Sequence, residues 1–526
     1  MVRQPAPLSK YFPYAITLLF FILSFIGILN HEMWRDEYQA WMVAADAHSI
    51  PELFKNLKYE GNPVLWHAFL FIITSVTDDP FWMQVFHILI STTSIYLINR
   101  YSPLPIIQKV LLTFGYYTFF EYNLISRSYG LGLLLVVIFC VLYRNREKYI
   151  LWIAAVLFLL SNVTIFGVML AVCFGGIIIW ERLFQVKKDK GPVIPWTQLV
   201  IFTAIVAAGV LSGYLQIRPE PDNSFPQMYV THYDPIRTKF TFSRMMHAYF
   251  PIPDFRTLHF WNTNILVPAG FKHMFWPAPI LFLLWVLAFL RYRLILLLYA
   301  GGTLLLIIFF YYTGNLWSRY AGHLFVLLVV CCWLVHDHKE RPFKNTFLNQ
   351  FSLLTDRIRV PFFILILAVN AYGGIRSYLK DLKYPFSNSP KAAAFMKEHK
   401  LDQYNIIGSR DYITSPLAVQ LGKKMWYAER HEFGSFIIYD QKRLNLFSFN
   451  DVQATINELN RNGANRIILV ISSPVQKTDP DTGVSVPWLE GKISENLSMK
   501  LLTSIPGGIV LDEQYHIYSI DAISGQ

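Results

Sequence analysis

The chain has 526 residues, of which 54% are hydrophobic and only 15% are charged, and its formal net charge is +11. A soluble protein of this length would need far more charge to cover its surface, so the composition excludes a soluble globular protein. Apolar runs close to the roughly 20 residues that cross a hydrocarbon core recur along the chain and indicate a polytopic membrane protein.

The positive charge gathers in short clusters between the apolar runs, at 100–109, 144–148, 182–190, 291–293 and 339–359. Cytoplasmic loops of membrane proteins carry such an excess of Lys and Arg, so this distribution speaks against a nucleic-acid partner. If every cluster is cytoplasmic, the chain crosses the membrane eleven times, with its N-terminus inside and its C-terminus outside. The predicted spans are 14–30, 81–99, 106–121, 130–143, 150–161, 163–180, 197–214, 278–290, 294–312, 321–335 and 360–376.

One apolar run, Pro63–Val76, is left over. A crossing there would place every later basic loop outside, so we expect an interfacial or re-entrant helix on the outer side. Four segments then gather outside: 30–79, 121–129, 215–277 and 314–320. The four cysteines all lie inside apolar runs, which favours packing over a disulfide or metal framework.

The part of the chain from about Tyr384 onward alternates helix and strand patterns and contains no nucleotide-binding motif. The expected helices are Lys391–Lys397, Pro416–Leu421 and Val452–Asn460, and the expected strands are Asn405–Gly408 and Arg466–Ser472. Such alternation indicates a small α/β domain with a parallel sheet. We therefore predict an α-helical polytopic membrane domain over 1–376, with outer loops 30–79 and 215–277, and an extracytoplasmic α/β domain over 384–526.

An acidic pair, Asp36-Glu37, follows the first predicted span. Carboxylates at a membrane boundary are costly unless water, a partner or chemistry holds them there, and one at the mouth of an outer cavity can act as a general base. The structural alternative is that Asp36 is the N-cap of a helix that begins at Tyr38. His31-Glu32 beside the pair is no zinc motif, because position 35 is Arg where the HExxH pattern requires His.

Two further motifs stand at predicted outer helix starts: Ser126-Arg127-Ser128-Tyr129 and Trp317-Ser318-Arg319-Tyr320-Ala321-Gly322-His323. The planar Arg fork matches phosphate oxygens bidentately. The alternative for each Arg is a snorkelling side chain that anchors a helix end. Two such motifs at one membrane level favour a shared anionic ligand, and the basic, aromatic-rich loop 215–277 is expected to lie on the outer membrane surface.

The chain resembles the GT-C superfamily of membrane glycosyltransferases, in particular the bacterial branch akin to protein O-mannosyltransferases and the aminoarabinose transferase of lipid A. The resemblance covers about 1–376 and rests on Asp36-Glu37 after the first span, Asn62-Pro63 before a short apolar helix, Arg127-x-Tyr129 in the second outer turn, and the late Arg319-Tyr320. The outer domain also resembles the tail of bacterial members, as in Phe386-Ser387-Asn388-Ser389.

This resemblance implies a GT-C-like enzyme of the cell inner membrane that takes a sugar from a polyprenyl-phosphate carrier on the periplasmic side. It implies Asp36 as the catalytic base, with Glu37 beside it. The residues then expected to bind the donor phosphate are Arg127, Tyr129, Arg319, Tyr320 and His323. Several relatives carry a second Asp after the first Arg, sometimes at a metal site, where this chain has Ser128-Tyr129. No metal ligand is therefore assigned, and the requirement for a divalent cation stays open.

Two other classes handle similar substrates. A polyprenyl-linked glycan ligase or a flippase of the cell envelope also binds polyprenyl phosphates, but ligases centre on a large outer loop between late spans, which leaves the early acidic pair without a role. A secondary transporter is disfavoured because the chain shows no internal repeat and its charges lie at the span edges. The expected partners are a polyprenyl-phosphate-linked sugar, membrane lipids and an acceptor glycan, lipid or protein. The sequence does not identify the sugar or the acceptor.

Overall fold

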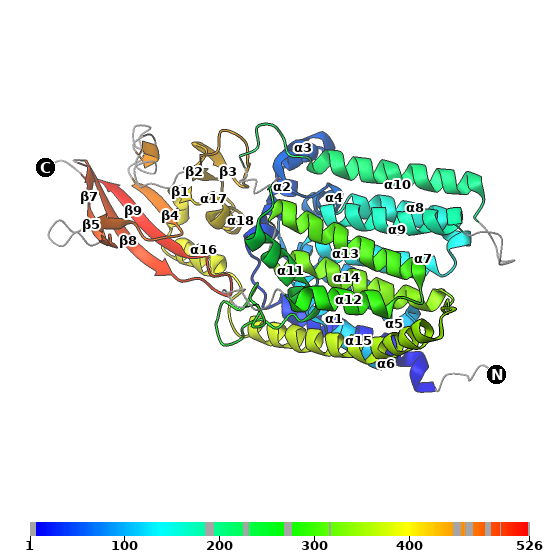
Figure 1. Cartoon of the computed structure of the whole chain (residues 1–526). Coiled ribbons are helices and arrows are strands. Elements are labelled where there is room, and N and C mark those ends of the chain that lie inside the picture. Colours follow the sequence, from blue (N-terminus) through cyan, green and yellow to red (C-terminus); the bar gives the residue numbers. More distant parts are fainter. Residues whose placement is uncertain are drawn as a thin grey trace.

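The computed structural model describes residues 7–184, 194–224, 230, 232–267, 276–314, 317–444, 454–456, 458, 466–478, 485–494 and 496–523. Long helices lie alongside one another in a bundle, and a sheet domain stands at one end of it (Figure 1). The described chain begins at the bundle end far from the sheet domain and ends in the sheet domain. The site described below lies between the two.

Seven helices among the described residues are long and apolar enough to cross a membrane. They are α1 (Pro7–Ile28), α5 (Phe81–Tyr101), α9 (Ile165–Phe184), α10 (Trp196–Ile217), α13 (Arg293–Thr313), α14 (Ser318–Leu334) and α15 (Thr346–Asp381). The other four predicted spans fall on shorter helices: α6 (Ile106–Thr113), α7 (Ser128–Tyr143), α8 (Arg146–Ser161) and α12 (Pro277–Ala288). The chain is a multi-pass membrane protein, and the count of eleven spans stays a prediction.

The predicted span 106–121 is interrupted. Helix α6 ends at Thr113, and a separate π-helical turn, η2, runs over Tyr116–Glu121. Helix α15 packs closely here, because a Cβ on Gly374 would meet the carbonyl oxygen of Phe114 at 2.5 Å. Only glycine admits this approach, so the break in the span is built into the packing of α15.

The basic clusters that the sequence assigned to the cytoplasm lie together. The Arg146 side chain forms an ion pair with Glu181, so the start of α8 meets the end of α9. The amide of Arg341 donates to the carbonyl of Arg291 at 3.0 Å, which joins the two later clusters. Tyr143 and His338 approach within 3.0 Å and connect the two groups. The described parts of these four clusters therefore share one end of the bundle.

Four more helices lie outside the predicted spans: α2 (Arg35–Ala45), α3 (Ile50–Asn56), α4 (Leu65–Thr74) and α11 (Pro235–Tyr249). Helix α4 occupies the leftover apolar run and, at 10 residues, is too short to cross a membrane. The sequence did not predict α11, which lies in the loop expected on the membrane surface. Asp234 caps its start, and its second half is buried against α14, so that part of the loop belongs to the protein core.

The C-terminal domain contains one seven-stranded sheet in the order β3-β2-β1-β4-β9-β8-β7. Its strands are β1 (Asn405–Ser409), β2 (Met425–Tyr427), β3 (Glu432–Gly434), β4 (Arg466–Ile471), β7 (Glu490–Ser494), β8 (Leu497–Ile505) and β9 (Tyr515–Ala522). A separate pair is formed by β5 (Gln476–Thr478) and β6 (Ser485–Pro487). Helices α16 (Ser389–Glu398), α17 (Asp411–Thr414) and α18 (Pro416–Leu421) complete the described part.

The expected parallel sheet is correct only at its centre. Strand β1 is parallel to β2 and β4, whereas β9, β8 and β7 add antiparallel strands beside β4. The sheet is therefore mixed, and the prediction of an entirely parallel sheet was wrong, because the last 30 residues return as a long hairpin rather than through a helix. Two predicted helices match α16 and α18, while most of Val452–Asn460 lies outside the described residues. The domain boundary near 376–384 stays a prediction.

Candidate active site

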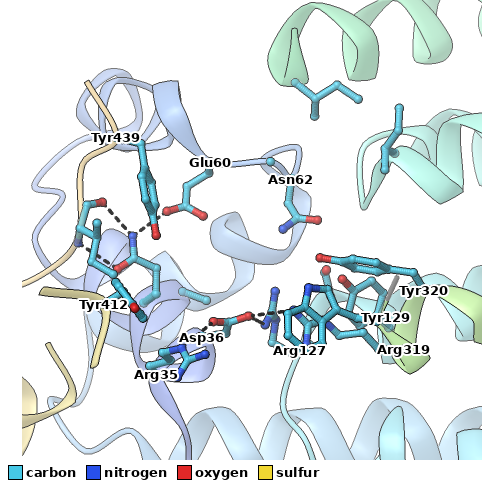
Figure 2. A pocket seen from close by; sticks show the side chains of 18 of the residues that line it. Arg35, Asp36, Glu60, Asn62, Arg127, Tyr129, Arg319, Tyr320, Tyr412 and Tyr439 are labelled. Carbon is cyan, nitrogen blue, oxygen red and sulfur yellow. Dashed lines mark hydrogen bonds and ion pairs between the residues drawn. The ribbon is translucent and has the colours of Figure 1, made fainter. Parts of the chain in front are cut away.

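A cavity of about 1390 Å³ lies between one end of the bundle and the C-terminal domain. Its walls come from α2, the segment 58–62, the first residues of α7, α9 and α14, the ends of α10 and α13, and the domain beyond residue 384. Figure 2 shows Asp36 between Arg35 and Arg127, with Glu60 and Tyr439 on another wall of the same space. Segments far apart in sequence thus meet around one acidic residue.

Helix α2 places Asp36 on the cavity wall. The helix begins at Arg35 after an extended N-cap residue, Trp34, and Asp36 stands in its first turn. Asp36 is therefore not the N-cap, and that alternative for its role was wrong. The Asp36 carboxylate is directed to the cavity, where 29% of its side chain is exposed.

Glu37 fixes the start of α2 from inside the protein. One of its oxygens accepts the Trp34 amide at 3.1 Å and lies 3.3 Å from His31 Nε2, and the other accepts the Ser126 amide at 2.6 Å. His31 in turn binds Asp381 at the end of α15 at 2.8 Å. Glu37 is fully buried and is not among the residues that line the cavity, so the structure separates it from its neighbour in the expected catalytic pair.

Two arginines converge on a single oxygen of Asp36. Arg127 Nη1 donates to Asp36 Oδ2, and Arg319 Nη2 lies 3.4 Å from the same atom. Burial opposes the charged form of this carboxyl group, but the positive charges of Arg127, Arg319 and Arg35 outweigh it and hold the pKa of Asp36 below its ordinary value. Asp36 is therefore ionised at neutral pH, and its Oδ2 is occupied by two guanidinium groups.

Aromatic rings hold the two guanidinium groups in place. The Arg319 guanidinium lies over the rings of Trp34 and Trp261, at 5.2 and 5.8 Å from their centroids. The Arg127 guanidinium lies 5.9 Å from the Trp34 ring and 5.8 Å from the Tyr129 ring. Such contacts are attractive, and they limit the rotamers open to a long side chain. The forks are thus oriented before any ligand arrives.

The backbone that carries Arg127 is fixed from behind. The ring of His87 on α5 lies 2.9 Å from both the Asn123 and the Arg127 carbonyl oxygens, so it bridges the turn that precedes α7. A Cβ at Gly130 would lie 2.5 Å from His87 Nε2, which explains why the third residue of α7 is glycine. This turn is therefore a rigid support for Arg127.

The other three expected phosphate-binding residues divide into two groups. Tyr129 and Tyr320 line the cavity and meet in an edge-to-face contact with centroids 6.2 Å apart. His323 lies one turn further along α14 and is not a lining residue. Its Nδ1–H donates to the Tyr320 carbonyl at 3.0 Å, and its ring stacks on Phe166 at 4.2 Å. His323 therefore packs behind the wall: it shares the face of α14 that carries Arg319 but lies one turn deeper, where Phe166 covers its ring.

Sequence reasoning missed several lining residues. Glu60 accepts a hydrogen bond from Gln39 at 2.6 Å, and its pKa is raised because the carboxyl group is buried. The C-terminal domain contributes Tyr412, Tyr439 and Arg443. Glu60 stands only two residues before the Asn62-Pro63 motif, which was a usable signal, whereas nothing in the local sequence singles out the three residues of the domain.

Two solved structures resemble this fold. ArnT from Cupriavidus metallidurans bound to undecaprenyl phosphate is 11% identical, with a TM-score of 0.47, over 98% of this chain and 98% of that chain. The apo state of ArnT is 13% identical, with a TM-score of 0.49, over 90% of this chain and 94% of that one. No family model and no curated protein matches the chain. At these identities the likeness assigns no role to any residue.

The site combines three chemical capacities. It offers a carboxylate that can accept a proton, two delocalised cations that can bind a phosphate, and an enclosed space partly lined by aromatic rings. Within the described residues, no group of three or more His, Cys, Asp or Glu side chains lies where it could hold a metal ion.

Proposed function

We propose that this protein is a membrane glycosyltransferase that moves a sugar from a polyprenyl-phosphate carrier to an acceptor hydroxyl on the outer face of the membrane. Asp36 acts as the general base, and Arg127 and Arg319 hold the carrier phosphate. The observation that carries this proposal is the convergence of both guanidinium groups on Asp36 at the wall of a large cavity. The proposed base and the two arginines of the proposed anion site meet at one atom, Asp36 Oδ2. This arrangement suits a reaction in which a phosphate leaves while a hydroxyl group attacks.

The shape of the cavity suits a donor with an apolar tail and a charged head. One part of its lining is made of apolar and aromatic side chains at the ends of α9, α10 and α13, namely Ile165, Phe166, Tyr214, Ile217, Phe309 and Tyr312. The arginine pair lies on another wall of the same space. A polyprenyl chain enters between those helices from the membrane, and its phosphate lies at the arginines, where two planar forks can bind its oxygens bidentately.

Donor binding also prepares the base. In the free enzyme both arginines are engaged by Asp36 Oδ2. The phosphodiester of the donor carries one negative charge, as a carboxylate does, and each of its two non-bridging oxygens can accept from one guanidinium group, so it replaces Asp36 as their partner. Asp36 then loses the interactions that keep its pKa low and becomes a stronger proton acceptor. The donor therefore binds first, and Asp36 acquires basicity only when a donor is present.

The transfer step follows from this arrangement. Asp36 takes the proton of the acceptor hydroxyl while the hydroxyl oxygen forms a bond to the anomeric carbon of the sugar. The bond between that carbon and the phosphate oxygen breaks, and its electrons stay on the phosphate. Arg127 and Arg319 neutralise the charge that develops there without transferring a proton. The products are the glycosylated acceptor, the polyprenyl phosphate and a protonated Asp36, which returns its proton to solvent.

The outer, periplasmic side of the cell inner membrane is the place we propose for the site. Supporting this, four of the basic clusters share one bundle end, while α2 and the C-terminal domain stand at the other (Figure 1). An excess of basic residues marks the cytoplasmic side. Long polyprenyl-phosphate donors cannot leave the bilayer, so a site at the membrane surface, open toward the apolar helix ends, is where such a donor can be reached.

The test is transfer by the purified protein with two donors that carry the same sugar. One is a polyprenyl-phosphate sugar, and the other is a soluble nucleotide sugar. We expect transfer to an extract of envelope lipids and glycans with the first donor only, with polyprenyl phosphate released in equal amount. Equal use of the nucleotide sugar would refute the proposal, and movement of intact carrier across vesicles without release of polyprenyl phosphate would favour a flippase.

A further inference from the structure

Helix α2 is bonded along its length to the C-terminal domain, although it belongs to the first outer segment of the chain. At its start, the Arg35 amide donates to Glu513 Oε1 at 2.9 Å, and the Arg35 guanidinium donates to Asp512 at 2.8 Å. In its middle, the Gln39 side chain donates to the Ile437 carbonyl and accepts from the Ile437 amide, both at 2.9 Å. These bonds cross from α2 to residues about 400 or more positions later in the chain.

The other end of α2 is held in the same way. Asp46, the C-cap residue, accepts a hydrogen bond from Ser435 and lies 3.3 Å from Lys424 Nζ. Between the two ends, Gln420 Nε2 donates to the Tyr38 hydroxyl at 3.0 Å. The start, the middle and the end of this 11-residue helix are thus each attached to the domain that stands over the cavity.

The contact at Glu513 differs from the others because it acts on the turn that carries Asp36. The first amides of a helix have no partner within the helix, and a carboxylate at that end is favourable. Glu37 satisfies the Trp34 amide from within α2, and Glu513 satisfies the next one, that of Arg35. Glu513 is fully buried, and its second oxygen accepts from the Ser387 hydroxyl. Asp36 follows Arg35 directly, so a shift of this turn moves the Asp36 carboxylate.

We infer that the C-terminal domain positions the catalytic base, and that Glu513 is the positioning residue, acting through the Arg35 amide at the start of α2. This inference rests on the proposed function in naming Asp36 as the base, whereas the attachment of α2 is independent of it. Without Glu513 the first turn of α2 loses an anchor, and Asp36 leaves the place where it meets Arg127 and the acceptor. A displacement of about 1 Å at a reacting group costs a rate factor of up to about 10².

Because Glu513 can ionise, the inference also predicts how stability and activity depend on pH. Burial raises the pKa of Glu513 to about 7, although Arg35 and the Ser387 hydroxyl oppose the shift. The groups that face it are Arg35 on α2, Ser387 before α16, and Asp512 beside it, with Tyr38 and Tyr515 in its electrostatic environment. Because the pKa in the folded protein exceeds that in the unfolded chain, ionisation of Glu513 lowers stability as the pH rises from about 4.5 to 7. The folded protein with a charged Glu513 is therefore less stable than the one with a protonated Glu513.

The experiment compares Glu513→Ala, Glu513→Gln and a matched control, Glu490→Gln, in the full-length protein. Glu490 lies on β7 of the same domain, its side chain is 65% exposed, and it pairs with Lys500. Hydrogen–deuterium exchange of peptides that cover 35–45 measures the attachment directly, without any substrate. We expect faster exchange in the first turn of α2 for Glu513→Ala and the wild-type rate for Glu490→Gln. An unchanged rate in Glu513→Ala would overturn the inference.

Kinetics and stability provide the second readout. For Glu513→Ala we expect kcat to fall roughly 10- to 100-fold with little change in the KM for the donor, because the arginines that bind phosphate stay in place. Wild-type activity should fall as the pH drops through about 7, and Glu513→Gln should lack this step. At pH 8 the Gln variant should unfold at a temperature no lower than the wild type does. If lost activity instead follows lost stability, Glu513 serves folding only.

The two proposals fail in different ways. If the wild-type protein does not use a polyprenyl-phosphate sugar, the proposed function is wrong, and the exchange measurement still decides whether Glu513 anchors α2. If the wild-type protein transfers sugar and both Glu513 variants match it in kcat and pH profile, the positioning role is wrong and the proposed function stands.

Discussion

Arg127 and Arg319 begin two different helices, yet both reach the same carboxylate oxygen, Oδ2 of Asp36. Each is largely buried, with 12% and 8% of its side chain exposed. Two cations that share one anion leave a net positive charge at this point, which is an unfavourable arrangement unless a further anion completes it. The carrier phosphate is the anion we propose.

The first prediction concerns Asp36→Asn. This change removes the proton acceptor and also releases both arginines, so we expect transfer to fall by about 10²–10⁴-fold while the carrier phosphate binds more tightly. Binding of polyprenyl phosphate to protein in lipid nanodiscs and single-turnover transfer measure the two effects separately. Weaker carrier binding in this variant would contradict the exchange of carboxylate for phosphate, and full activity would remove Asp36 from the mechanism.

The second prediction concerns the arginines. Arg127→Lys and Arg319→Lys keep the charge but lose the planar fork, so we expect a raised donor KM and a lower kcat, and we expect the Ala variants to abolish transfer. Arg256→Lys is the matched control, because its side chain is 84% exposed, pairs with Asp254 and does not line the cavity. Donor saturation curves for the five variants provide the comparison. A Lys variant with wild-type kinetics would show that charge alone is required there.

The third prediction separates Glu37 from Asp36. Each oxygen of the Glu37 carboxylate accepts a hydrogen bond from a backbone amide, one from Trp34 and the other from Ser126. In Glu37→Gln one oxygen becomes an NH₂ group, which is a donor and cannot accept from the backbone N–H that it meets. Glu37→Gln should therefore destabilise the protein by about 1–3 kcal/mol, the cost of leaving buried hydrogen-bonding groups unpaired. Thermal unfolding in detergent measures this loss. Activity per folded molecule should stay far above that of Asp36→Asn, and the reverse order would return Glu37 to the chemistry.

The fourth prediction concerns topology. Single cysteines at exposed positions 256 and 400 should react with an impermeant thiol reagent added from outside, and those at exposed positions 148 and 344 should not. The four native cysteines are first replaced by Ala or Ser. Labelling at 148 from outside in intact cells would invert the orientation of the bundle. In that case positions 256 and 400 should react only after the membrane is opened, and the cavity would lie on the cytoplasmic side.

The sequence predicted the helices of the membrane domain well because apolar length is a local property. Each of the eleven predicted segments contains helix in the structure, and the leftover run became the short helix α4. The break at Thr113 was not predictable, since it depends on Gly374, which packs there from α15. The same reason explains α11, whose burial against α14 is visible only in three dimensions.

The sequence identified individual residues of the candidate site but not the contacts among them. Arg127 and Arg319 were singled out because a cation at the outer start of an apolar helix needs an explanation. That they meet one oxygen of Asp36 follows from helix packing, which no spacing reveals. Glu37 looked equivalent to its neighbour, but successive residues on a helix point about 100° apart, and this rotation places one carboxylate in the cavity and the other in the core. The roles of these residues remain to be tested.

The bond between Arg35 and Glu513 joins residues 478 positions apart. A ribosome that adds ~5–20 residues per second needs roughly 25–95 s to travel from one to the other. During that time α2 already exists, and the partner for its first amide has not been made. A chain that stops anywhere before Glu513 therefore carries every residue of the arginine–carboxylate cluster and still lacks the support for the turn that holds Asp36. Synthesis and folding of the segment that carries Glu513 is thus a condition for the inferred support of Asp36, and under the proposed function we expect a half-made chain not to consume carrier-linked sugar.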